Sequence, residues 1–208
     1  MAIKIALLGL GTVGSGVLKI IKNNKKKIRQ TSGEEIIIEK ALVRNPEKHR
    51  NLANEVMLTT DFDSILQDPE IKIVVELIGG LHPAKEYITA AINAGKNVVT
   101  ANKDLMATFG SELINLAASK KCDLMYDASV AGGIPILRTL ATSYSSDIIS
   151  EIQGIINGTT NYILSQMGEK GLSYEEALKN AQELGFAEAD PTNDVTGKDA
   201  AYKIVILS

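Results

Sequence analysis

The chain has 208 residues, which is long enough for one large domain or two small domains with separate hydrophobic cores. Hydrophobic residues make up 45% of it, and its formal net charge of -3 argues against general binding to nucleic acid. The single cysteine, Cys122, excludes an internal disulfide framework and fits a reducing compartment. No apolar run has membrane-spanning length and no secretory leader opens the sequence, so a cytoplasmic location without membrane contact is the expectation.

The sequence GLGTVG at residues 9–14 follows an apolar run and precedes a helical pattern. This order of strand, G-x-G-x-x-G turn and helix is the context in which the glycine spacing predicts a dinucleotide-binding site. Gly9 permits the tight turn, Gly11 lets a pyrophosphate approach the backbone, and Gly14 lets the helix pack closely on the strand. The alternative interpretation is a glycine-rich turn without a ligand. The predicted cofactor contacts are Gly9, Gly11, Thr12, Val13 and Gly14.

The apolar run at 36–43 predicts a second strand, and its carboxyl end is where a dinucleotide-binding fold reads the adenosine ribose. A site that prefers NAD places an acid there, whereas this sequence continues with Arg44 and further basic residues up to Arg50. A guanidinium can hold a 2′-phosphate by a bidentate pair of hydrogen bonds. Arg44 therefore favours NADP, with NAD still possible, and the alternative is an exposed loop arginine.

Strands and helices are predicted to alternate through the first half of the chain. Further strands are expected at 71–77, 97–100 and 123–126, and helices at 61–66, 84–94 and 112–119. This alternation predicts an α/β domain with a Rossmann-type, doubly wound and mostly parallel sheet over residues 1–133. Lys103 follows the strand at 97–100, at the sheet edge where such folds bind ligands, and is a candidate site residue. By composition alone it would be an ordinary surface lysine.

The small, glycine-rich segment 127–135 breaks this rhythm and suits a crossover into a second domain, 134–208. After a short helix at 136–142 and an apolar run at 148–156, five polar or glycine residues at 157–161 open a helix predicted at 162–167. That is more polar residues than a helix cap needs, so some of them are candidates to hold polar atoms of a ligand. Another helix is predicted at 174–184.

Residues 185–194 carry three carboxylates around Pro191, so this segment is predicted to be non-helical, with a helix resuming over 195–203. Asp199 and Lys203 are four residues apart and share one face of that helix. Three interpretations stay open: acids that complement a helix start, an exposed ion pair, and a site for a cationic substrate.

With these residues in view, the chain resembles the homoserine dehydrogenase family over essentially its whole length. The resemblance is carried by residues 9–16, 100–103, 127–135 with 157–161, and above all 185–203. A Gly-aromatic-x-Glu-x-Asp-Pro run followed by spaced acids and a lysine is not a general feature of dehydrogenases. The resemblance implies hydride transfer between NAD(P) and the pair L-homoserine and L-aspartate 4-semialdehyde, in threonine and methionine biosynthesis.

The resemblance also implies roles for particular residues. Lys103 and Lys203 are the lysines associated with proton transfer, and Lys103 also belongs to the cofactor site. The implied substrate contacts are Gly158, Thr159, Glu188, Asp190, Asp194 and Asp199, with Glu188 on the substrate ammonium and Asp199 at the reacting end. A sodium ion is implied on the loop that contains Asp127, Val130 and Gly132, bound largely through backbone carbonyls. Asp127 stands where the family leads us to expect a glutamate.

The sequence stops at 204–208 inside an apolar helical run, whereas members of the family continue. The resemblance therefore implies the amino-terminal portion of the enzyme, with an incomplete α+β substrate-binding and dimerisation domain at 134–208. We expect such a piece to bind the cofactor but to have weak catalytic activity. We expect the complete protein to form a homodimer.

Two other functions are alternatives to this one. A semialdehyde dehydrogenase of the phosphorylating kind needs a nucleophilic cysteine, and Cys122 lies just before a predicted strand rather than at a helix start. A non-catalytic module that binds NAD(P) would keep residues 9–14 but has no need for Lys103 together with Glu188, Asp199 and Lys203. The presence of both sets favours the enzyme.

Overall fold

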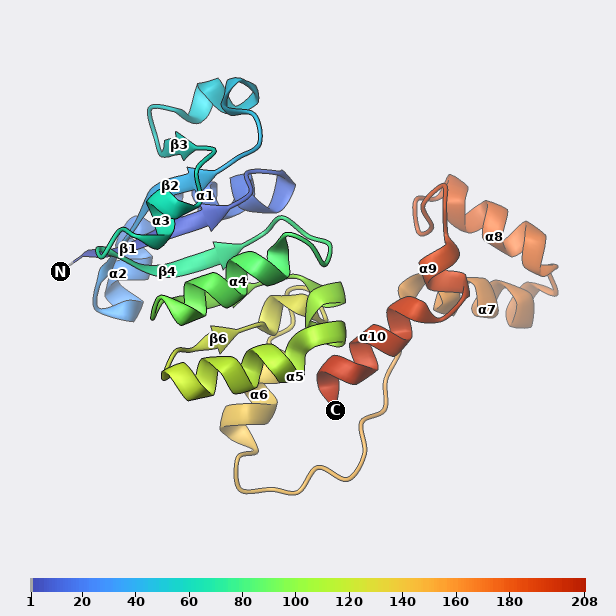
Figure 1. Ribbon diagram of the computed structural model, residues 1–208. Helices are drawn as coiled ribbons and strands as arrows, with labels where there is room; N and C mark the ends of the chain where they lie inside the picture. Colours follow the sequence, from blue (N-terminus) through green and yellow to red (C-terminus); the bar gives the residue numbers. More distant parts are fainter. Residues whose placement is uncertain (1) are drawn as a thin grey trace. The chain divides into compact units, whose positions relative to one another are not determined.

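The computed structural model describes residues 2–208 (Figure 1). Its first part is built on a six-stranded sheet with the strand order β3-β2-β1-β4-β5-β6, and every pairing is parallel. The strands are β1 (Ala2–Leu8), β2 (Glu35–Leu42), β3 (Met57–Thr59), β4 (Ile71–Glu76), β5 (Asn97–Thr100) and β6 (Leu124–Met125). The chain runs outward from β1 in one direction and then restarts at β4 on its other side. This confirms the predicted doubly wound α/β fold.

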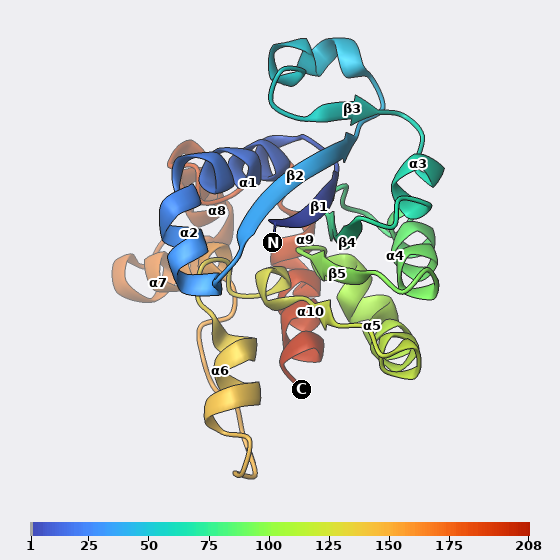
Figure 2. The same ribbon diagram turned by 90° about the vertical axis from the view of Figure 1, so that its left-hand side faces the viewer.

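Helices cover both faces of this sheet. They are α1 (Thr12–Asn23), α2 (Lys25–Ser32), α3 (Asp63–Leu66), α4 (Ala84–Asn93) and α5 (Lys103–Lys120), with 3-10 helices η1 (Pro46–Leu52) and η2 (Asp127–Ser129). Figure 2 shows α1 and α2 on one face and α3, α4 and α5 on the other. Along β1, Ile5 and Leu7 belong to one buried core, and Ala6 and Leu8 belong to the other. A strand buried on both faces reads as a continuous apolar run, which is why β1 and β4 were predictable.

Strand β3 and helix α5 are among the elements of this first part that differ from the sequence prediction. The edge strand β3 was not predicted, because three residues paired only to β2 are too short to give a hydrophobic pattern. Helix α5 begins at Lys103 rather than at residue 112. Its start is fixed by Asn102, whose side-chain oxygen accepts a hydrogen bond from the Leu105 backbone N–H at 3.1 Å.

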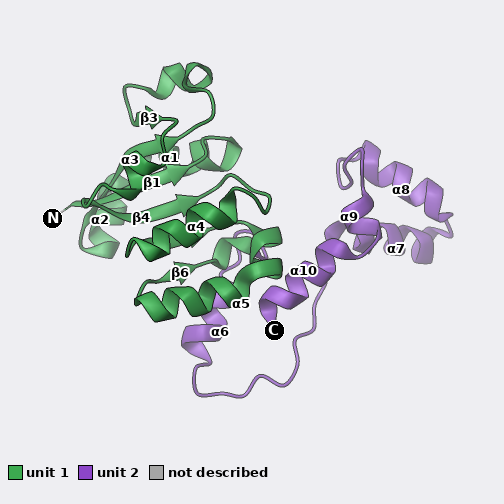
Figure 3. Cartoon of the chain, in the orientation of Figure 1, with its two compact units in different colours: residues 1–129 green, residues 130–208 purple. Residues whose placement is uncertain are grey.

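The chain divides into two compact units, residues 1–129 and residues 130–208 (Figure 3). The division falls slightly before the boundary expected after residue 133. Unit 2 contains α6 (Ile136–Ser143), α7 (Gly158–Lys170), α8 (Tyr174–Glu183), α9 (Thr192–Val195) and α10 (Lys198–Leu207). Its small buried core lies around α7 and α8 and contains Ile163, Ala177, Ala181 and Ala187.

Residues 130–208 form helices and irregular segments, and the expected α+β domain has no strand in them. The apolar run that was expected to start new structure at 148–156 is irregular, with 95% of Ile148 and 76% of Ile155 exposed. No helix among residues 2–208 is both long enough and apolar enough to span a membrane.

Two helix boundaries in unit 2 correct the prediction. Helix α7 starts at Gly158 rather than at residue 162, because Asn157 caps it and the residues after Asn157 form its first turn. The segment around Pro191 was predicted to exclude helix, but Thr192–Val195 forms the single turn α9. Proline is compatible with a position just before a first helical turn, since its missing N–H is not needed there.

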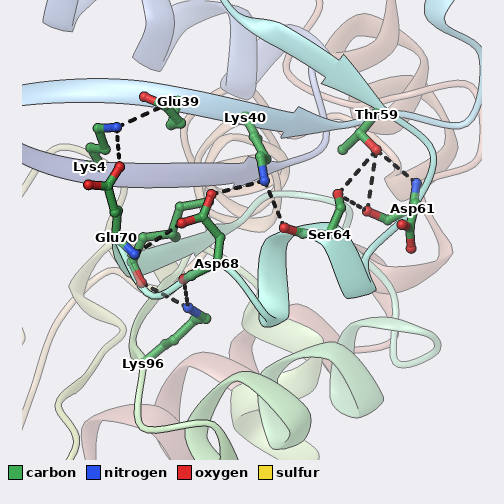
Figure 4. Close-up of polar contacts among 10 residues, drawn as sticks. Lys4, Glu39, Lys40, Thr59, Asp61, Ser64, Asp68, Glu70 and Lys96 are labelled. Atoms are coloured by element: carbon green, nitrogen blue, oxygen red, sulfur yellow. Dashed lines mark hydrogen bonds and ion pairs between the residues drawn. The ribbon is translucent and has the colours of Figure 1, made fainter.

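Polar side chains around Asp68 join β2 to segments that precede β4 and β5 (Figure 4). The buried Lys96 Nζ donates to the carbonyl oxygens of Asp68 and Ile71, at 2.7 and 2.9 Å, and burial lowers the pKa of Lys96. Lys40 Nζ donates to the Ser64 carbonyl at 2.7 Å and lies 3.0 Å from Asp68 Oδ2. The bond from Lys40 holds the pKa of the Asp68 carboxyl below its usual range, with help from the Glu70 backbone N–H. This network ties β2 to the segments that precede β4 and β5.

We predict that Asp68→Asn lowers the free energy of unfolding by about 1 kcal/mol at pH 7, a figure limited by the solvent that still reaches the pair, whose two side chains are 15% and 20% exposed. A carboxyl whose pKa falls on folding stabilises the folded state above its unfolded pKa of about 4. That stabilisation is lost as the pH falls through the lower folded-state pKa, so the variant and the wild type should converge below pH 4 in urea unfolding.

Asp61→Asn is the matched control, because an amide oxygen can still accept the bond that Asp61 takes from the Asp63 backbone N–H. A difference between Asp68→Asn and wild type that stays constant from pH 7 to pH 3 would contradict an ionic origin.

Candidate functional site

The glycine turn lies at the carboxyl end of β1, between the ends of two neighbouring strands. The Gly9 N–H donates to the Leu42 carbonyl at the end of β2, at 2.9 Å. Gly9 has φ +103°, and a Cβ added there would lie 3.0 Å from the Leu77 carbonyl oxygen beyond β4. Only glycine fits this left-handed and crowded position. The turn therefore sits where the strand order reverses, which is the edge where open α/β sheets bind ligands.

Gly14 brings α1 against this turn. A Cβ on Gly14 would lie 2.1 Å from the Gly9 carbonyl oxygen, so no larger residue fits without a backbone shift. A Cβ on Gly11 would meet no atom within 4 Å, so the space next to it is open. Gly11 is the N-cap of α1 and supplies no side-chain hydrogen bond, and Thr12 and Val13 are exposed. The first N–H groups of α1 have no partner within the helix and form a site suited to an anion.

A fully buried carboxylate organises the neighbouring strand ends. Glu76, the last residue of β4, accepts bonds from the backbone N–H groups of Ile78 and Gly79, at 2.7 and 3.1 Å. Its other oxygen accepts from the Thr100 hydroxyl at the end of β5, at 2.6 Å. Every oxygen of this buried charge thus has a donor, as burial requires. Glu76 fixes the loop after β4 relative to the end of β5.

The same set of bonds places Lys103. The Asn102 N–H donates to the Thr100 hydroxyl at 3.1 Å, and the Asn102 side-chain amide donates to the Gly80 carbonyl at 2.6 Å. Lys103 follows as the first residue of α5 and is half-buried. It therefore stands at the carboxyl edge of the sheet, as the sequence predicts, but on a helix start rather than in a loop. Arg44, just beyond β2, is exposed at this edge too.

Unit 2 gathers a second set of predicted residues around Asn157. Its side-chain nitrogen donates to Asp194 Oδ1 at 2.7 Å and to Asp199 Oδ2 at 2.8 Å. Lys203 Nζ lies 2.6 Å from Asp199 Oδ2 and donates to the Ile156 carbonyl at 2.8 Å. The pair Asp199–Lys203 is mostly buried, with 9% of the Asp199 side chain and 24% of the Lys203 side chain exposed. The interpretation of this pair as an exposed ion pair is therefore wrong.

Other predicted substrate contacts lie around this cluster. Thr159 is buried, and its hydroxyl donates to the Phe186 carbonyl at 2.6 Å, while Gly158 is exposed at the start of α7. Glu188 and Asp190 are exposed on the segment after α8. Asp190 accepts from the Thr192 hydroxyl and backbone N–H, and these bonds lower the pKa of its carboxyl. The structure thus brings Asp194, Asp199 and Lys203 together and leaves Glu188 and Asp190 outside their hydrogen-bond network.

The loop expected to hold sodium contains no cluster of acidic side chains. Asp127 opens η2, Val130 is buried, and Ala131 and Gly132 have φ +58° and +57°. No group of three or more His, Cys, Asp or Glu suited to a metal occurs among residues 2–208. The donors that this loop offers are backbone carbonyls and one carboxylate. Oxygen atoms are the ligand type that hard cations such as Ca²⁺ and Mg²⁺ take in proteins.

Sequence reasoning missed Glu76 and the bridging role of Asn157. A lone acid that ends an apolar strand was the available signal for Glu76, since a charge there must find donors. Asn157 reads as an ordinary helix cap. Its bonds reach residues 37 and 42 positions later, which no local pattern encodes.

Comparison with known proteins shows the family of the chain. A sequence profile described as the homoserine dehydrogenase NAD binding domain matches residues 9–127, and one described as homoserine dehydrogenase matches residues 135–208. The chain belongs to the homoserine dehydrogenase family. The resemblance to this family that the sequence predicts is confirmed.

Homoserine dehydrogenases of known sequence are closely similar to it. That of Bacillus subtilis is 53% identical over 209 residues, covering 100% of this chain and 48% of its own length. That of Lactococcus lactis is 53% identical over 211 residues, covering 100% of this chain and 49% of its own length. The chain therefore spans about half the length of the curated relatives it matches.

Solved structures of homoserine dehydrogenases share the fold. That from Thiobacillus denitrificans has a TM-score of 0.89 and 49% identity, covering 100% of this chain and 48% of that one. A hyperthermophilic archaeal homoserine dehydrogenase in complex with NADPH has a TM-score of 0.82 and 28% identity, covering 100% of this chain and 69% of that one.

We predict that Gly14→Ala lowers the free energy of unfolding by about 2 kcal/mol or more, because the methyl group overlaps the Gly9 carbonyl. Gly16→Ala, in the same helix, meets no atom within 4 Å and should stabilise by up to about 1 kcal/mol. Urea unfolding of both variants checks this contrast. Equal stability of the two variants would show that the close approach at Gly14 is not a constraint.

Proposed function

We propose that this chain carries the nucleotide site and part of the substrate site of an enzyme that interconverts L-homoserine and L-aspartate 4-semialdehyde with NAD(P). The proposal is carried by the presence of two features in the same chain. One is the glycine turn at the start of α1, and the other is the buried Asp199–Lys203 pair, in which Asn157 donates to Asp199. A nucleotide-sensing module needs only the first. The family membership agrees with both.

The cofactor proposal rests on the carboxyl edge of unit 1. When bound, NAD(P) supplies the nicotinamide that exchanges a hydride with the carbinol carbon of the substrate. The N–H groups at the start of α1 would hold the pyrophosphate, with Gly11 leaving room for it. Arg44 would hold the 2′-phosphate of NADP, which makes NADP the preferred form and NAD a possible one. A hyperthermophilic archaeal relative has been solved in complex with NADPH, which supports binding of NAD(P) in general.

The substrate proposal assigns proton transfer to lysine and charge recognition to acids. Oxidation of an alcohol by hydride loss also requires removal of the hydroxyl proton, and reduction of the aldehyde requires its return. Lys103 and Lys203 are the groups proposed for this exchange. Glu188, Asp190 and Asp194 would surround the substrate ammonium, and Asp199 would contact the reacting end. Gly158 and Thr159, in the first turn of α7, would lie against the substrate and the nicotinamide.

Two further parts of the proposal concern the whole protein. Sodium would be held by the oxygen donors of the loop at Asp127, Val130 and Gly132, largely through backbone carbonyls. The complete protein would form a homodimer. The oxygen donor set of the loop supports the first part, and the family resemblance supports the second.

The test is oxidation of NADPH by the full-length protein with aspartate semialdehyde, followed by absorbance, beside the same assay with NADH. The wild type should turn over, and Lys103→Ala should lower kcat by roughly 1,000-fold, because proton transfer is lost. NADPH binding, measured by fluorescence, should stay nearly intact in the variant. Lys120→Ala, at the other end of α5, is the control and should keep full activity.

An inactive wild type that still binds NADPH would refute the proposed reaction, but the proposed cofactor site would still stand. Full activity of Lys103→Ala would remove that lysine from the mechanism.

We predict that Arg44→Ala raises the Kd for NADPH about tenfold, by loss of a charge-assisted pair with the 2′-phosphate. The Kd for NADH should change less than about twofold, because NADH has no such phosphate. Arg50→Ala removes another exposed arginine beyond β2 and is the matched control. Equal weakening of NADPH and NADH by Arg44→Ala would contradict its role in choosing the cofactor.

A further inference from the structure

A single buried amide connects three segments of unit 2. Asn157 Nδ2 donates to Asp194 Oδ1 in α9, at 2.7 Å, and to Asp199 Oδ2 in α10, at 2.8 Å. Asn157 Oδ1 accepts from the Thr160 backbone N–H in the first turn of α7, at 2.8 Å. One side chain therefore caps α7 and holds two acids that belong to the proposed substrate site.

The orientation of this amide follows from the chemistry of its neighbours. A backbone N–H can only donate, so Thr160 must face the amide oxygen. An ionised carboxylate can only accept, so Asp194 and Asp199 must face the amide nitrogen. Both amide hydrogens are used, and a flipped amide would oppose all three neighbours.

We propose that Asn157 is a positioning residue for the reaction, because its amide holds the carboxylates of Asp194 and Asp199 in fixed places. This inference rests on the proposed function, which assigns those acids to the substrate. Asn157 itself need not touch the substrate.

The acids need such a donor because two carboxylates near one another repel, and burial of Asp199 strengthens the repulsion. Asn157 offsets this by donating to both. Asp199 then fixes Lys203, whose Nζ lies 2.6 Å from Asp199 Oδ2 and is also bound to the Ile156 carbonyl. Displacement of Asn157 would therefore displace acid and lysine together.

A second tie keeps the start of α7 in place. The Thr159 hydroxyl donates to the Phe186 carbonyl at 2.6 Å, and the Phe186 ring stacks on Tyr162 with ring centroids 4.8 Å apart. Both contacts join the first part of α7 to the segment that carries Glu188. The amide of Asn157 thus extends from a fixed helix start, which is what accurate placement of the two acids requires.

The decisive variant is Asn157→Asp in the full-length protein. Aspartate caps helices as well as asparagine does, so the bond to Thr160 survives, while the donor to Asp194 and Asp199 becomes a like charge. We expect kcat/KM for aspartate semialdehyde to fall roughly 10- to 100-fold, as misplaced site groups cause. The KM for NADPH should change less than about twofold.

Two controls separate positioning from general damage. Asn180→Asp makes the same change on α8, a helix that contains neither Asp194 nor Asp199, and Ser173→Ala removes the cap of α8. Both should keep kcat/KM within about twofold of wild type. Wild-type kcat/KM in Asn157→Asp, or a KM for NADPH that rises in parallel with the loss, would overturn the proposal.

A readout without activity keeps this inference separate from the proposed function. Asn157→Asp should lower the midpoint of thermal unfolding by a few degrees, and by clearly less in the Asp194→Asn background, where one repelling charge is gone. If the wild type fails to use aspartate semialdehyde, the proposed reaction is refuted and this comparison still decides the contact. An equal fall in both backgrounds would show that Asn157 does not hold Asp194.

Discussion

The close approach of Gly14 to the Gly9 carbonyl is the constraint on which unit 1 depends. A Cβ at Gly14 would lie 2.1 Å from that oxygen, so helix α1 can pack directly against the turn after β1 only because residue 14 has none. This contact directs the uncapped start of α1 toward the carboxyl edge of the sheet. Since β1 lies between β2 and β4, the same edge carries the strand ends that precede Arg44 and Lys103. Burial of β1 on both faces keeps this arrangement rigid.

Each unit also depends on one buried polar side chain that bridges distant segments. In unit 1, Glu76 accepts three hydrogen bonds and joins the loop after β4 to the end of β5. In unit 2, Asn157 donates to two acids and joins the start of α7 to α9 and to the start of α10. Neither residue is among those that the family resemblance assigns to chemistry. Both hold such residues in place, because a buried polar group must satisfy its partners and so fixes their positions.

The sequence predicts the elements whose signals are local. Apolar runs identify β1, β2, β4 and β5. The glycine spacing locates the turn, because the glycines of the sequence pattern stand at the positions where the backbone requires glycine. Strand β3 escaped prediction because it has three residues, and the start of α5 escaped because Asn102 caps it within a polar stretch. The acid–lysine pair was predictable from its spacing. Its burial and its link to Asn157 were not, since both arise from tertiary contacts across about 40 residues.

Hydrogen exchange of backbone amides, measured with and without saturating NADPH, tests most directly whether the glycine turn binds the nucleotide. The N–H groups at residues 11–14, with those of the neighbouring strand ends, should exchange more slowly in the presence of NADPH. The amino-terminal edge around Lys96, on the far side of the sheet, should not change. Unchanged exchange at the turn under saturation, or protection confined to another part of the chain, would contradict a nucleotide site at the start of α1.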